Sequence, residues 1–301
     1  MPQGIYLPEG MGMECRRYTE GVAGMARAMA DGAVLEGMAV ACSADGELTV
    51  RMGRLEGIIP RSEGALEDGR PIAVLSRVGH PVCFMVIGRV GDRYLLSRRA
   101  AQQAARRHFM EELQPGDVVR VRVTHLEPFG AFVDLGCGLP SLIGIENISV
   151  SRTGHPRERF VPGQVIQAVV LAIDREKERV VLSHRELLGT WEENLEGIEV
   201  GQTRMGIVRG VADYGVFVEL TPNLSGLAEP CGRDLEPGDG VSVYVKSILL
   251  DRMKVKLLVI DRLEKGDGHI GEDHYFIRGG RLDRWQYSPD CCRSRIITTV
   301  F

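Results

Sequence analysis

The chain has 301 residues, a formal net charge of −4 and only 6% aromatic residues. This length allows roughly two to four domains, and the hydrophobic content of 44% is ordinary for a globular protein. The negative charge counts against a generic basic nucleic-acid binder. No apolar run reaches the length of a membrane span and no signal-peptide core opens the sequence, so we expect a cytoplasmic protein without a membrane partner.

Three segments precede the clearest repeat of the chain. Residues 1–30 are rich in Gly and Met without a clear period, and we expect an arm there. Residues 31–97 loosely repeat the residue spacing of two domain copies that follow at 114–185 and 200–262. This predicts a degenerate barrel, which lacks the pair of aromatic residues found in each later copy. Residues 98–113 are rich in helix formers and contain neither Gly nor Pro, so we predict a helical linker.

A phrase that occurs twice defines the next part of the chain. Residues 116–135 read GDVVRVRVTHLEPFGAFVDL and residues 201–220 read GQTRMGIVRGVADYGVFVEL. Such self-similarity indicates two copies of one small domain, which we place at 114–185 and 200–262, with 186–199 as a connector. Each copy alternates apolar with polar residues over short strands, which is typical of a small Greek-key barrel.

The last segment, 263–301, is predicted to be an extension with a hairpin around Gly279–Gly280. Its aromatic residues Trp285 and Tyr287 are expected to pack on the third barrel, and the alternative is that they extend an RNA surface. The expected fold class of the whole chain is therefore mainly β. It comprises three tandem OB-fold five-stranded barrels, a short helical linker and a C-terminal hairpin extension.

The repeated phrase places aromatic rings at equivalent positions. Phe129 and Phe132 in one copy match Tyr214 and Phe217 in the next. Strand residues alternate between the inside and the outside of a barrel. The second ring of each pair, Phe132 or Phe217, is called the inner ring here. It lies on the same side of its strand as a carboxylate two residues later, so it is predicted to face water. Those carboxylates are Asp134 and Glu219. Unpaired bases are natural partners for exposed rings, since each stack contributes about 1–3 kcal/mol. The alternative is that the rings pack against a neighbouring barrel or the connector.

The full pattern resembles a known family. The F/Y-G-x-F-V phrase, a following G-L, a P-G turn, a V-x-x-I-D phrase and a closing L-S are similar to the RNA-binding domain of the ribosomal protein S1 family. The resemblance is strong over 114–262 and weak over 31–113, and the layout is similar to short homologues of clostridial-type bacteria. It implies barrels that bind single-stranded RNA through two aromatics, a histidine, an aspartate and a basic residue.

Carried over residue by residue, the resemblance implies an RNA-binding set of Phe129, Phe132, Asn147, Asp174, Arg179, Tyr214, Phe217, Asp251 and Lys254. Asn147 stands where the family has its histidine, and its amide can still hydrogen-bond a base or a ribose hydroxyl. Glu229 stands there in the third barrel and is expected to repel phosphate. We therefore expect the second barrel to be the main site and the third barrel either to bind more weakly or to prefer another partner.

Histidines and a cysteine pair are lesser signals. His125, His155 and His184 lie on different elements, and the adjacent Cys291 and Cys292 are poor joint ligands, so no metal site is predicted. The full sequence contains no phosphate-binding loop, no nucleophile elbow and no zinc-protease helix. No catalytic residue and no cofactor are therefore expected.

Together these features predict a non-enzymatic protein that binds single-stranded RNA, in particular mRNA on or near the small ribosomal subunit in translation. The alternative is a ribosome- or protein-binding interaction module with little RNA affinity, which the negative charge, Asn147 and Glu229 favour. A third reading keeps the RNA contact but places the chain in a ribonuclease or transcription complex. The oligomeric state stays open, as does the partner of the first barrel, RNA or protein.

Overall fold

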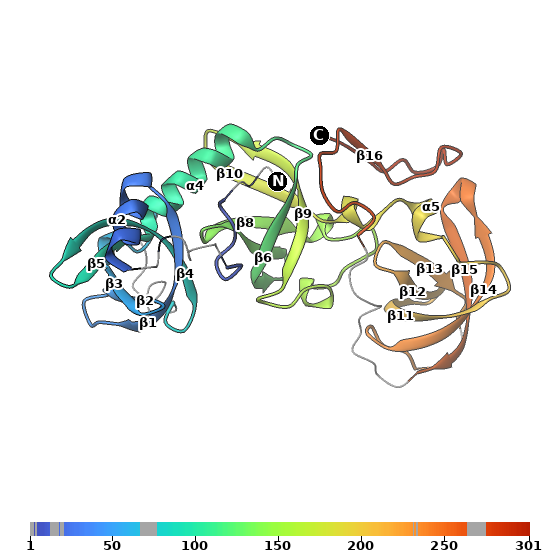
Figure 1. The fold of residues 1–301 in the computed structure, drawn as a ribbon. Helices are drawn as coiled ribbons and strands as arrows, with labels where there is room; N and C mark the ends of the chain where they lie inside the picture. Colours follow the sequence, from blue (N-terminus) through green and yellow to red (C-terminus); the bar gives the residue numbers. More distant parts are fainter. Residues whose placement is uncertain are drawn as a thin grey trace.

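The computed structural model describes residues 3, 5–12, 18, 21–66, 77–230, 232, 234–263 and 275–301. Three closed barrels follow one another along the chain and lie in a row (Figure 1). Each has five strands, of which the third and fifth pair in parallel and the other neighbours pair antiparallel. This is the arrangement of the OB fold, so the expected fold class is confirmed.

The first barrel is preceded by a helix and built from short strands. The strands are β1 (Val34–Cys42), β2 (Leu48–Met52), β3 (Leu55–Ile59), β4 (Pro81–Val90) and β5 (Arg93–Ser97). The helix α2 (Gly21–Asp31) covers this barrel, and its residues Met25 and Ala28 are buried in the barrel's hydrophobic cluster. A 3-10 turn, η1 (Arg61–Glu63), follows β3.

The predicted linker is a helix, α4 (Arg98–Glu112), which lies between barrels one and two (Figure 1). It begins after Ser97, whose hydroxyl accepts a hydrogen bond from the backbone N–H of Ala100 at 2.8 Å. Ala105 and Phe109 on one face are buried in the core of barrel two. The linker therefore packs against barrel two and also against β4 of barrel one.

The second barrel begins after this helix. Its strands are β6 (Val118–Glu127), β7 (Gly130–Gly136), β8 (Leu139–Gly144), β9 (Val165–Asp174) and β10 (Arg179–Ser183). Val119, Val121 and Val123 are buried in its core, as the alternation in the sequence predicts. Two 3-10 turns, η2 (Ile145–Asn147) and η3 (Pro156–Glu158), lie between β8 and β9.

The third barrel follows a short connector made of η4 (Arg185–Leu188) and α5 (Trp191–Asn194). Its strands are β11 (Thr203–Ala212), β12 (Gly215–Thr221), β13 (Leu224–Ala228), β14 (Gly240–Leu249) and β15 (Lys254–Arg262). The 3-10 turn η5 (Leu250–Arg252) joins the last two strands. Trp191 of the connector is buried in the core of this barrel, so the connector is anchored to it.

The tail does not form the hairpin predicted around Gly279–Gly280. Instead, the backbone N–H of Val118 donates to the carbonyl of Gly280 at 3.1 Å, and that of Leu282 donates to the carbonyl of Gly116 at 3.0 Å. The prediction was wrong because the backbone groups at the start of β6 are pairing partners that a local turn signal does not reveal.

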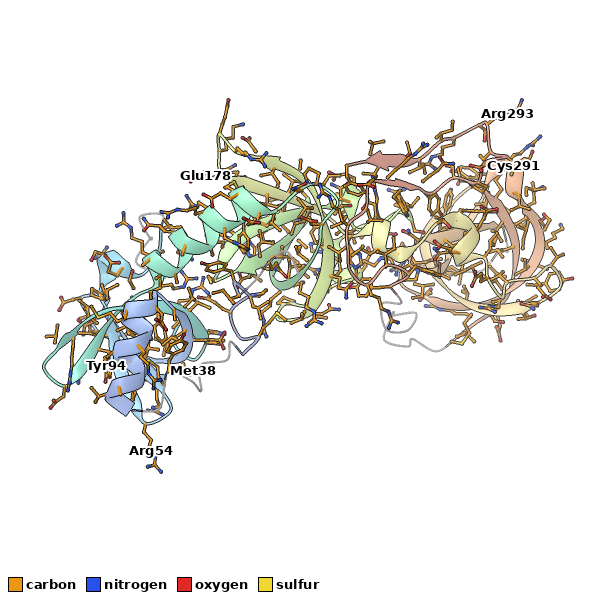
Figure 2. All side chains as sticks on the ribbon, turned by 45° about the horizontal axis from the view of Figure 1, so that its top comes forward. Met38, Arg54, Tyr94, Glu178, Cys291 and Arg293 are labelled. Carbon is orange, nitrogen blue, oxygen red and sulfur yellow. The ribbon has the colours of Figure 1, made fainter. Side chains whose placement is uncertain are left out.

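A two-stranded antiparallel sheet does occur further along the tail, formed by β16 (Arg284–Gln286) and β17 (Thr298–Val300). Trp285 and Tyr287 are buried in the core cluster of barrel three, as expected. The segment between the two strands projects outward and carries Arg293 near its end (Figure 2). The tail therefore contacts both barrel two and barrel three.

The N-terminal arm lies between the first two barrels. Glu9 is buried there and forms salt bridges with Arg98 of α4 at 2.7 Å and with Arg77 at 3.0 Å. The backbone N–H of Glu9 donates to the carboxylate of Asp134 in β7 at 2.7 Å. The arm thus connects barrel one, the linker helix and barrel two.

Candidate nucleic-acid interface

Two aromatic rings meet at the same place on barrels two and three. Phe129 and Phe132 have ring centroids 5.9 Å apart and an interplanar angle of 85°. Tyr214 and Phe217 have ring centroids 6.0 Å apart and an interplanar angle of 90°. Three of these rings are exposed and Phe132 is half-buried. Edge-to-face pairs that are open to solvent leave ring faces available to a planar ligand.

The glycine between the rings of each pair is required by close strand packing. A Cβ at Gly130 would lie 2.5 Å from the carbonyl oxygen of Ile143, and a Cβ at Gly215 would lie 2.4 Å from that of Ala228. No side chain fits at either position. The repeated F/Y-G-x-F phrase therefore reflects a strand start where the outer ring, the glycine and the inner ring each have a fixed place.

The carboxylates in phase with the inner rings do not face water. Asp134 and Glu219 are 4% and 0% exposed, which corrects the inference that they mark a solvent-facing side. Asp134 accepts hydrogen bonds from the backbone N–H groups of Glu9, Gly136 and Gly138. The outer face of each barrel is covered there by another part of the chain, namely the arm on barrel two and the η3 loop on barrel three.

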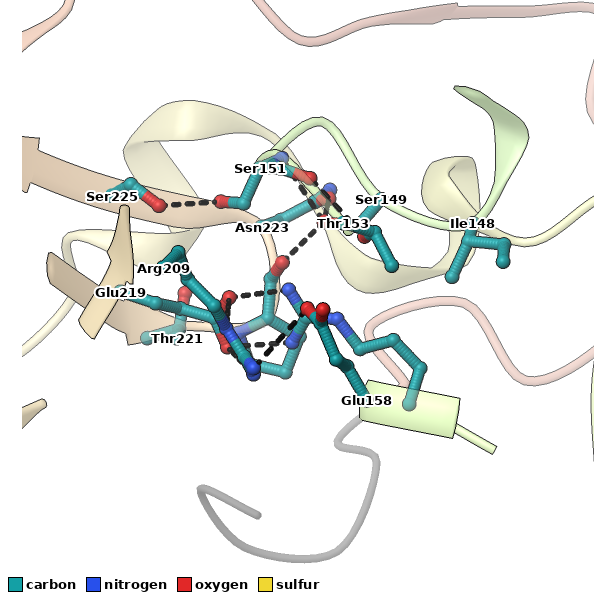
Figure 3. Close-up of polar contacts among 12 residues, drawn as sticks. Ile148, Ser149, Ser151, Thr153, Glu158, Arg209, Glu219, Thr221, Asn223 and Ser225 are labelled. Atoms are coloured by element: carbon teal, nitrogen blue, oxygen red, sulfur yellow. Dashed lines mark hydrogen bonds and ion pairs between the residues drawn. The ribbon is translucent and has the colours of Figure 1, made fainter. Parts of the chain in front are cut away.

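Glu219 joins barrel three to barrel two (Figure 3). Arg159, which follows η3, forms a bidentate salt bridge with it. Arg209 of β11 donates to the same carboxylate from Nε at 2.9 Å and from Nη2 at 3.1 Å, and it also reaches Glu158 at 3.3 Å. A buried carboxylate with two guanidinium partners is compensated in charge. The network holds the η3 loop beside barrel three.

The inner ring of barrel two, Phe132, is part of a row of register partners that crosses the outer face of the barrel. Phe132 lies between His125 of β6 and Leu142 of β8, and Leu142 lies beside Val181 of β10. All four residues are exposed or half-buried. The resulting strip is apolar except for the imidazole at its edge.

The matching row on barrel three differs at both ends. Phe217 lies between Gly210 of β11 and Leu227 of β13, and Leu227 lies beside Lys256 of β15. Lys256 therefore places an ammonium group where barrel two has Val181. Lys254 lies two residues earlier on the same strand and has the same outward direction, so this row has two cationic groups beside its ring.

His125 covers the inner ring of barrel two, whereas barrel three has no counterpart. The imidazole stacks on Phe132 with centroids 4.2 Å apart and planes 10° apart. Gly210 has no side chain, and an ideal Cβ there would meet the Phe217 ring at 3.8 Å. One face of Phe217 is therefore open where the matching face of Phe132 is occupied. The sequence alone does not place His125 at the site, because the strand register across a bulge is not visible in it.

The other predicted residues of barrel two lie in η2 and at the β9–β10 turn, and Arg179 points outward two residues before Val181, the position that Lys254 has in barrel three. Asp174 and Arg179 are register partners at the β9–β10 turn. The pKa of Asp174 is lowered, first by the hydrogen bond from the backbone N–H of Lys177 at 3.0 Å. Asn147 is 8% exposed, and its carbonyl accepts from the backbone N–H of His184. Among the contacts of the described residues, none joins these groups to the ring pair.

Barrel three does bring most of its predicted residues together. Tyr214, Phe217 and Lys254 line one groove of about 750 Å³, a volume typical of ligand sites. Asp251 lies outside the groove lining and forms a salt bridge with Arg252 at 3.5 Å. The groove also includes Lys256, which the sequence analysis did not assign although its two-residue spacing from Lys254 was visible.

Glu229 does not act as a free negative charge beside this groove. The ammonium of Lys246 lies 2.6 Å from its carboxylate. The hydrogen bond and charge of Lys246, together with the charge of Lys256, hold the pKa of Glu229 below its usual value. The expected repulsion of phosphate presumed an uncompensated carboxylate. The pairing with Lys246 therefore weakens the reason for ranking barrel three below barrel two.

The histidines have structural partners. Nδ1 of His155 accepts from the backbone N–H of Arg157 and caps η3. Nδ1 of His184 lies 3.0 Å from the carbonyl oxygen of Ile148. Within the described ranges, no cluster of His, Cys, Asp or Glu is suited to hold a metal ion. In the same part of the chain, no helix combines the length and apolarity that a membrane crossing requires.

The chain carries a domain of the S1 RNA-binding family. Residues 112–185, which include the ring pair of barrel two, match the model of the S1 RNA binding domain. The resemblance predicted from the sequence is therefore confirmed. The family model reaches the linker helix at one end and the end of β10 at the other.

Two ribosomal proteins are similar over a larger part of the chain. The small ribosomal subunit protein bS1 of Neisseria meningitidis serogroup B is 31% identical over 249 residues, which cover 76% of this chain and 44% of the relative. The protein of the same name from Staphylococcus aureus strain N315 is 31% identical over 191 residues, which cover 58% and 49%. The chain thus spans about half the length of these relatives.

Among solved structures, a multidomain protein with nucleic acid binding domains from Streptococcus pneumoniae is similar at 16% identity and a TM-score of 0.27. The similarity covers 77% of this chain and 75% of that one. GSP13 from Bacillus subtilis is 33% identical with a TM-score of 0.23, and the similarity covers 24% of this chain and 56% of that one.

Proposed function

We propose that this chain binds single-stranded RNA by stacking unpaired bases on its two ring pairs. The observation that carries the proposal is the recurrence of one open edge-to-face pair at the same strand position on two barrels. Rings that served only to pack would be buried, whereas Phe129 and Tyr214 are 56% and 67% exposed. The S1 domain match supports the same ligand class.

Barrel three is the principal site in this proposal. One face of Phe217 is open, whereas His125 occupies the matching face in barrel two. Lys254 and Lys256 lie beside the ring and can meet phosphates, and Tyr214 lines the same groove. Stacking and phosphate contacts act together in proteins that bind single strands. Barrel two then contributes a second, weaker stacking surface.

The proposed setting is mRNA on or near the small ribosomal subunit, in the cytoplasm and without catalysis. Both similar ribosomal proteins are named for that subunit, which supports an association of this kind. The first barrel lacks the aromatic pair and is not part of the proposed RNA surface.

The test is a fluorescence anisotropy titration of the full chain with labelled oligo-U at low salt. Tyr214→Ala combined with Phe217→Ala removes two stacks of about 1–3 kcal/mol each, so we expect a Kd at least about tenfold higher. Phe129→Ala combined with Phe132→Ala should raise the Kd less. The control is Tyr244→Ala, because this tyrosine is exposed on β14 of the same barrel but outside the groove lining.

The outcomes separate the proposal from its rival. An unchanged Kd in the barrel-three variant, with wild-type circular dichroism, would refute stacking at that site. A loss confined to the barrel-two variant would restore the ranking expected from the sequence. Failure of the wild-type chain to bind oligo-U at all would favour a module that binds the ribosome or other proteins.

A further inference from the structure

The groove beside the rings of barrel three is built from three parts of the chain. One wall is the outer face of barrel three, with Phe217 and Leu227. A second wall comes from barrel two, whose segment after η2 contributes Arg152. The third wall is the tail, which contributes Arg295 and Ile297. A single S1-type barrel can supply only the first of these walls.

The lining of the groove is positive although the whole chain is negative. Arg152 from barrel two and Arg295 from the tail face the same space as Lys254 and Lys256 of β15. Among the residues that the structure describes, no carboxylate lines the groove. The salt bridges of the described residues include none for these four cations. The field in the groove therefore favours an anionic ligand, and local charge decides this even when the net charge is −4.

Asn223, a buried residue at the turn between β12 and β13, links the walls through its side chain and its backbone carbonyl. Its Oδ1 accepts from the backbone N–H of Val150 at 2.9 Å, which positions the barrel-two wall. Its Nδ2 donates to the carbonyl of Gly189 in the connector at 2.9 Å. Its own carbonyl accepts from the hydroxyl of Tyr287 in the tail at 2.5 Å. Figure 3 shows Asn223 among the contacts that join the two barrels.

Further hydrogen bonds fix the two added walls. Ser225 of β13 donates to the hydroxyl of Ser151 at 3.0 Å, next to Arg152 (Figure 3). In the tail, the backbone N–H of Ile297 donates to the hydroxyl of Ser288 at 2.8 Å, close to Arg295. Both arginines therefore lie on segments that are held in place before any ligand binds, which lowers the entropic cost of binding.

We propose that barrel two and the tail take part directly in this binding site, with Arg152 and Arg295 contacting phosphates of a strand whose bases stack on Tyr214 and Phe217. The inference rests on the proposed function and extends it from a barrel face to a three-walled channel. The ligand class is a flexible single strand, because a duplex keeps its bases stacked and offers no free base face. Binding at barrel three then depends on its junction with barrel two.

The test compares two wall variants with a matched control. Arg152→Gln and Arg295→Gln are titrated with labelled oligo-U of about 12 nucleotides, within the roughly 4–16 nucleotides that one OB fold occupies. Each variant should weaken binding several-fold. Each should also make the slope of log affinity against log salt shallower by about 0.7, the value for one lost phosphate contact on a single strand.

Arg293→Gln is the control. It removes the same charge from the same tail, but Arg293 lies at the outer end of the segment between β16 and β17 and outside the groove lining. We expect it to leave the affinity and the salt slope nearly unchanged. Circular dichroism and thermal unfolding of all three variants check that the exposed substitutions leave the fold intact.

The outcomes distinguish this inference from the proposed function. If Arg152→Gln and Arg295→Gln behave like Arg293→Gln while loss of Tyr214 and Phe217 weakens binding, the walls are passive and the inference is overturned, but the stacking proposal stands. If the wild-type chain does not bind the oligonucleotide, both fail. A duplex that binds as tightly as the single strand would also overturn the channel.

Discussion

At the residue scale, the two ring pairs differ most in the side chain opposite the inner ring. His125 stacks on Phe132, whereas Gly210 leaves Phe217 open. Both positions follow from the register of a bulged strand pair. The repeated F/Y-G-x-F phrase predicted both pairs of rings. It could not show which ring is covered, because the covering residue lies on a neighbouring strand.

This difference predicts the effect of exchanging the two residues. Gly210 is outside the left-handed region, and an added Cβ would meet Phe217 only at an ordinary contact distance of 3.8 Å, so a side chain fits there. Gly210→His should cover the ring and weaken oligo-U binding several-fold. His125→Gly should strengthen binding at barrel two, measured in a background that lacks Tyr214 and Phe217. Equal affinity of Gly210→His and wild type would contradict an open-ring site.

At the element scale, segments outside the barrels decide which outward residues are buried. Alternation along β7 correctly predicted that Val133 and Leu135 point inward. The same alternation placed Asp134 on the outer face but could not show that the arm covers it. Contacts such as that between Glu9 and Asp134 span 125 positions in the sequence, and no local pattern reveals them. The path of the tail was missed for the same reason.

The buried carboxyl under the arm predicts a pH dependence. Burial, followed by the charge of Glu9, raises the pKa of Asp134 to about 7, against the opposing effects of the backbone N–H of Glu9, the charge of Arg98 and the backbone N–H of Gly138. A carboxyl whose folded-state pKa exceeds its unfolded value binds more protons when folded. Its contribution to stability is therefore complete below about pH 4 and is lost as pH rises through about 7.

Asp134→Asn removes this titration while keeping a neutral side chain of the same shape. Relative to wild type, the variant should gain stability as the pH rises from about 4 to about 7, as measured by urea unfolding at each pH. Taking the difference between the two proteins cancels the titration of groups that both share. A difference in unfolding free energy that does not vary with pH would show that Asp134 stays ionised in the folded protein.

At the scale of the whole molecule, barrels two and three are joined by side-chain contacts and by the tail. Glu219 and Asn223 fasten barrel three to barrel two, and the tail runs along both. The repeat in the sequence predicted the number and type of barrels but not this junction. The sequence pattern places Arg159 in a polar loop and predicts that its partner Glu219 faces solvent. The groove exists because these segments meet.

The net charge of the chain does not show how charge is distributed over the folded molecule. A net charge of −4 argued against nucleic acid when it was averaged over the chain. Several carboxylates form salt bridges within the chain, such as Glu219 with its two arginines and Glu229 with Lys246. Arg152, Lys254, Lys256 and Arg295 line the groove instead, and the salt bridges of the described residues include none of them. Composition alone cannot separate these two populations of charge.

The central claim is that single-stranded RNA lies on the ring pair of barrel three, and ultraviolet cross-linking of oligo-U to the full chain tests it most directly. Mass spectrometry of the cross-linked peptides should place the main adducts at Tyr214 and Phe217, with weaker adducts at Phe129. A Tyr244→Ala control should leave this pattern unchanged. Cross-links confined to the first barrel, or to surfaces outside the groove, would contradict the account.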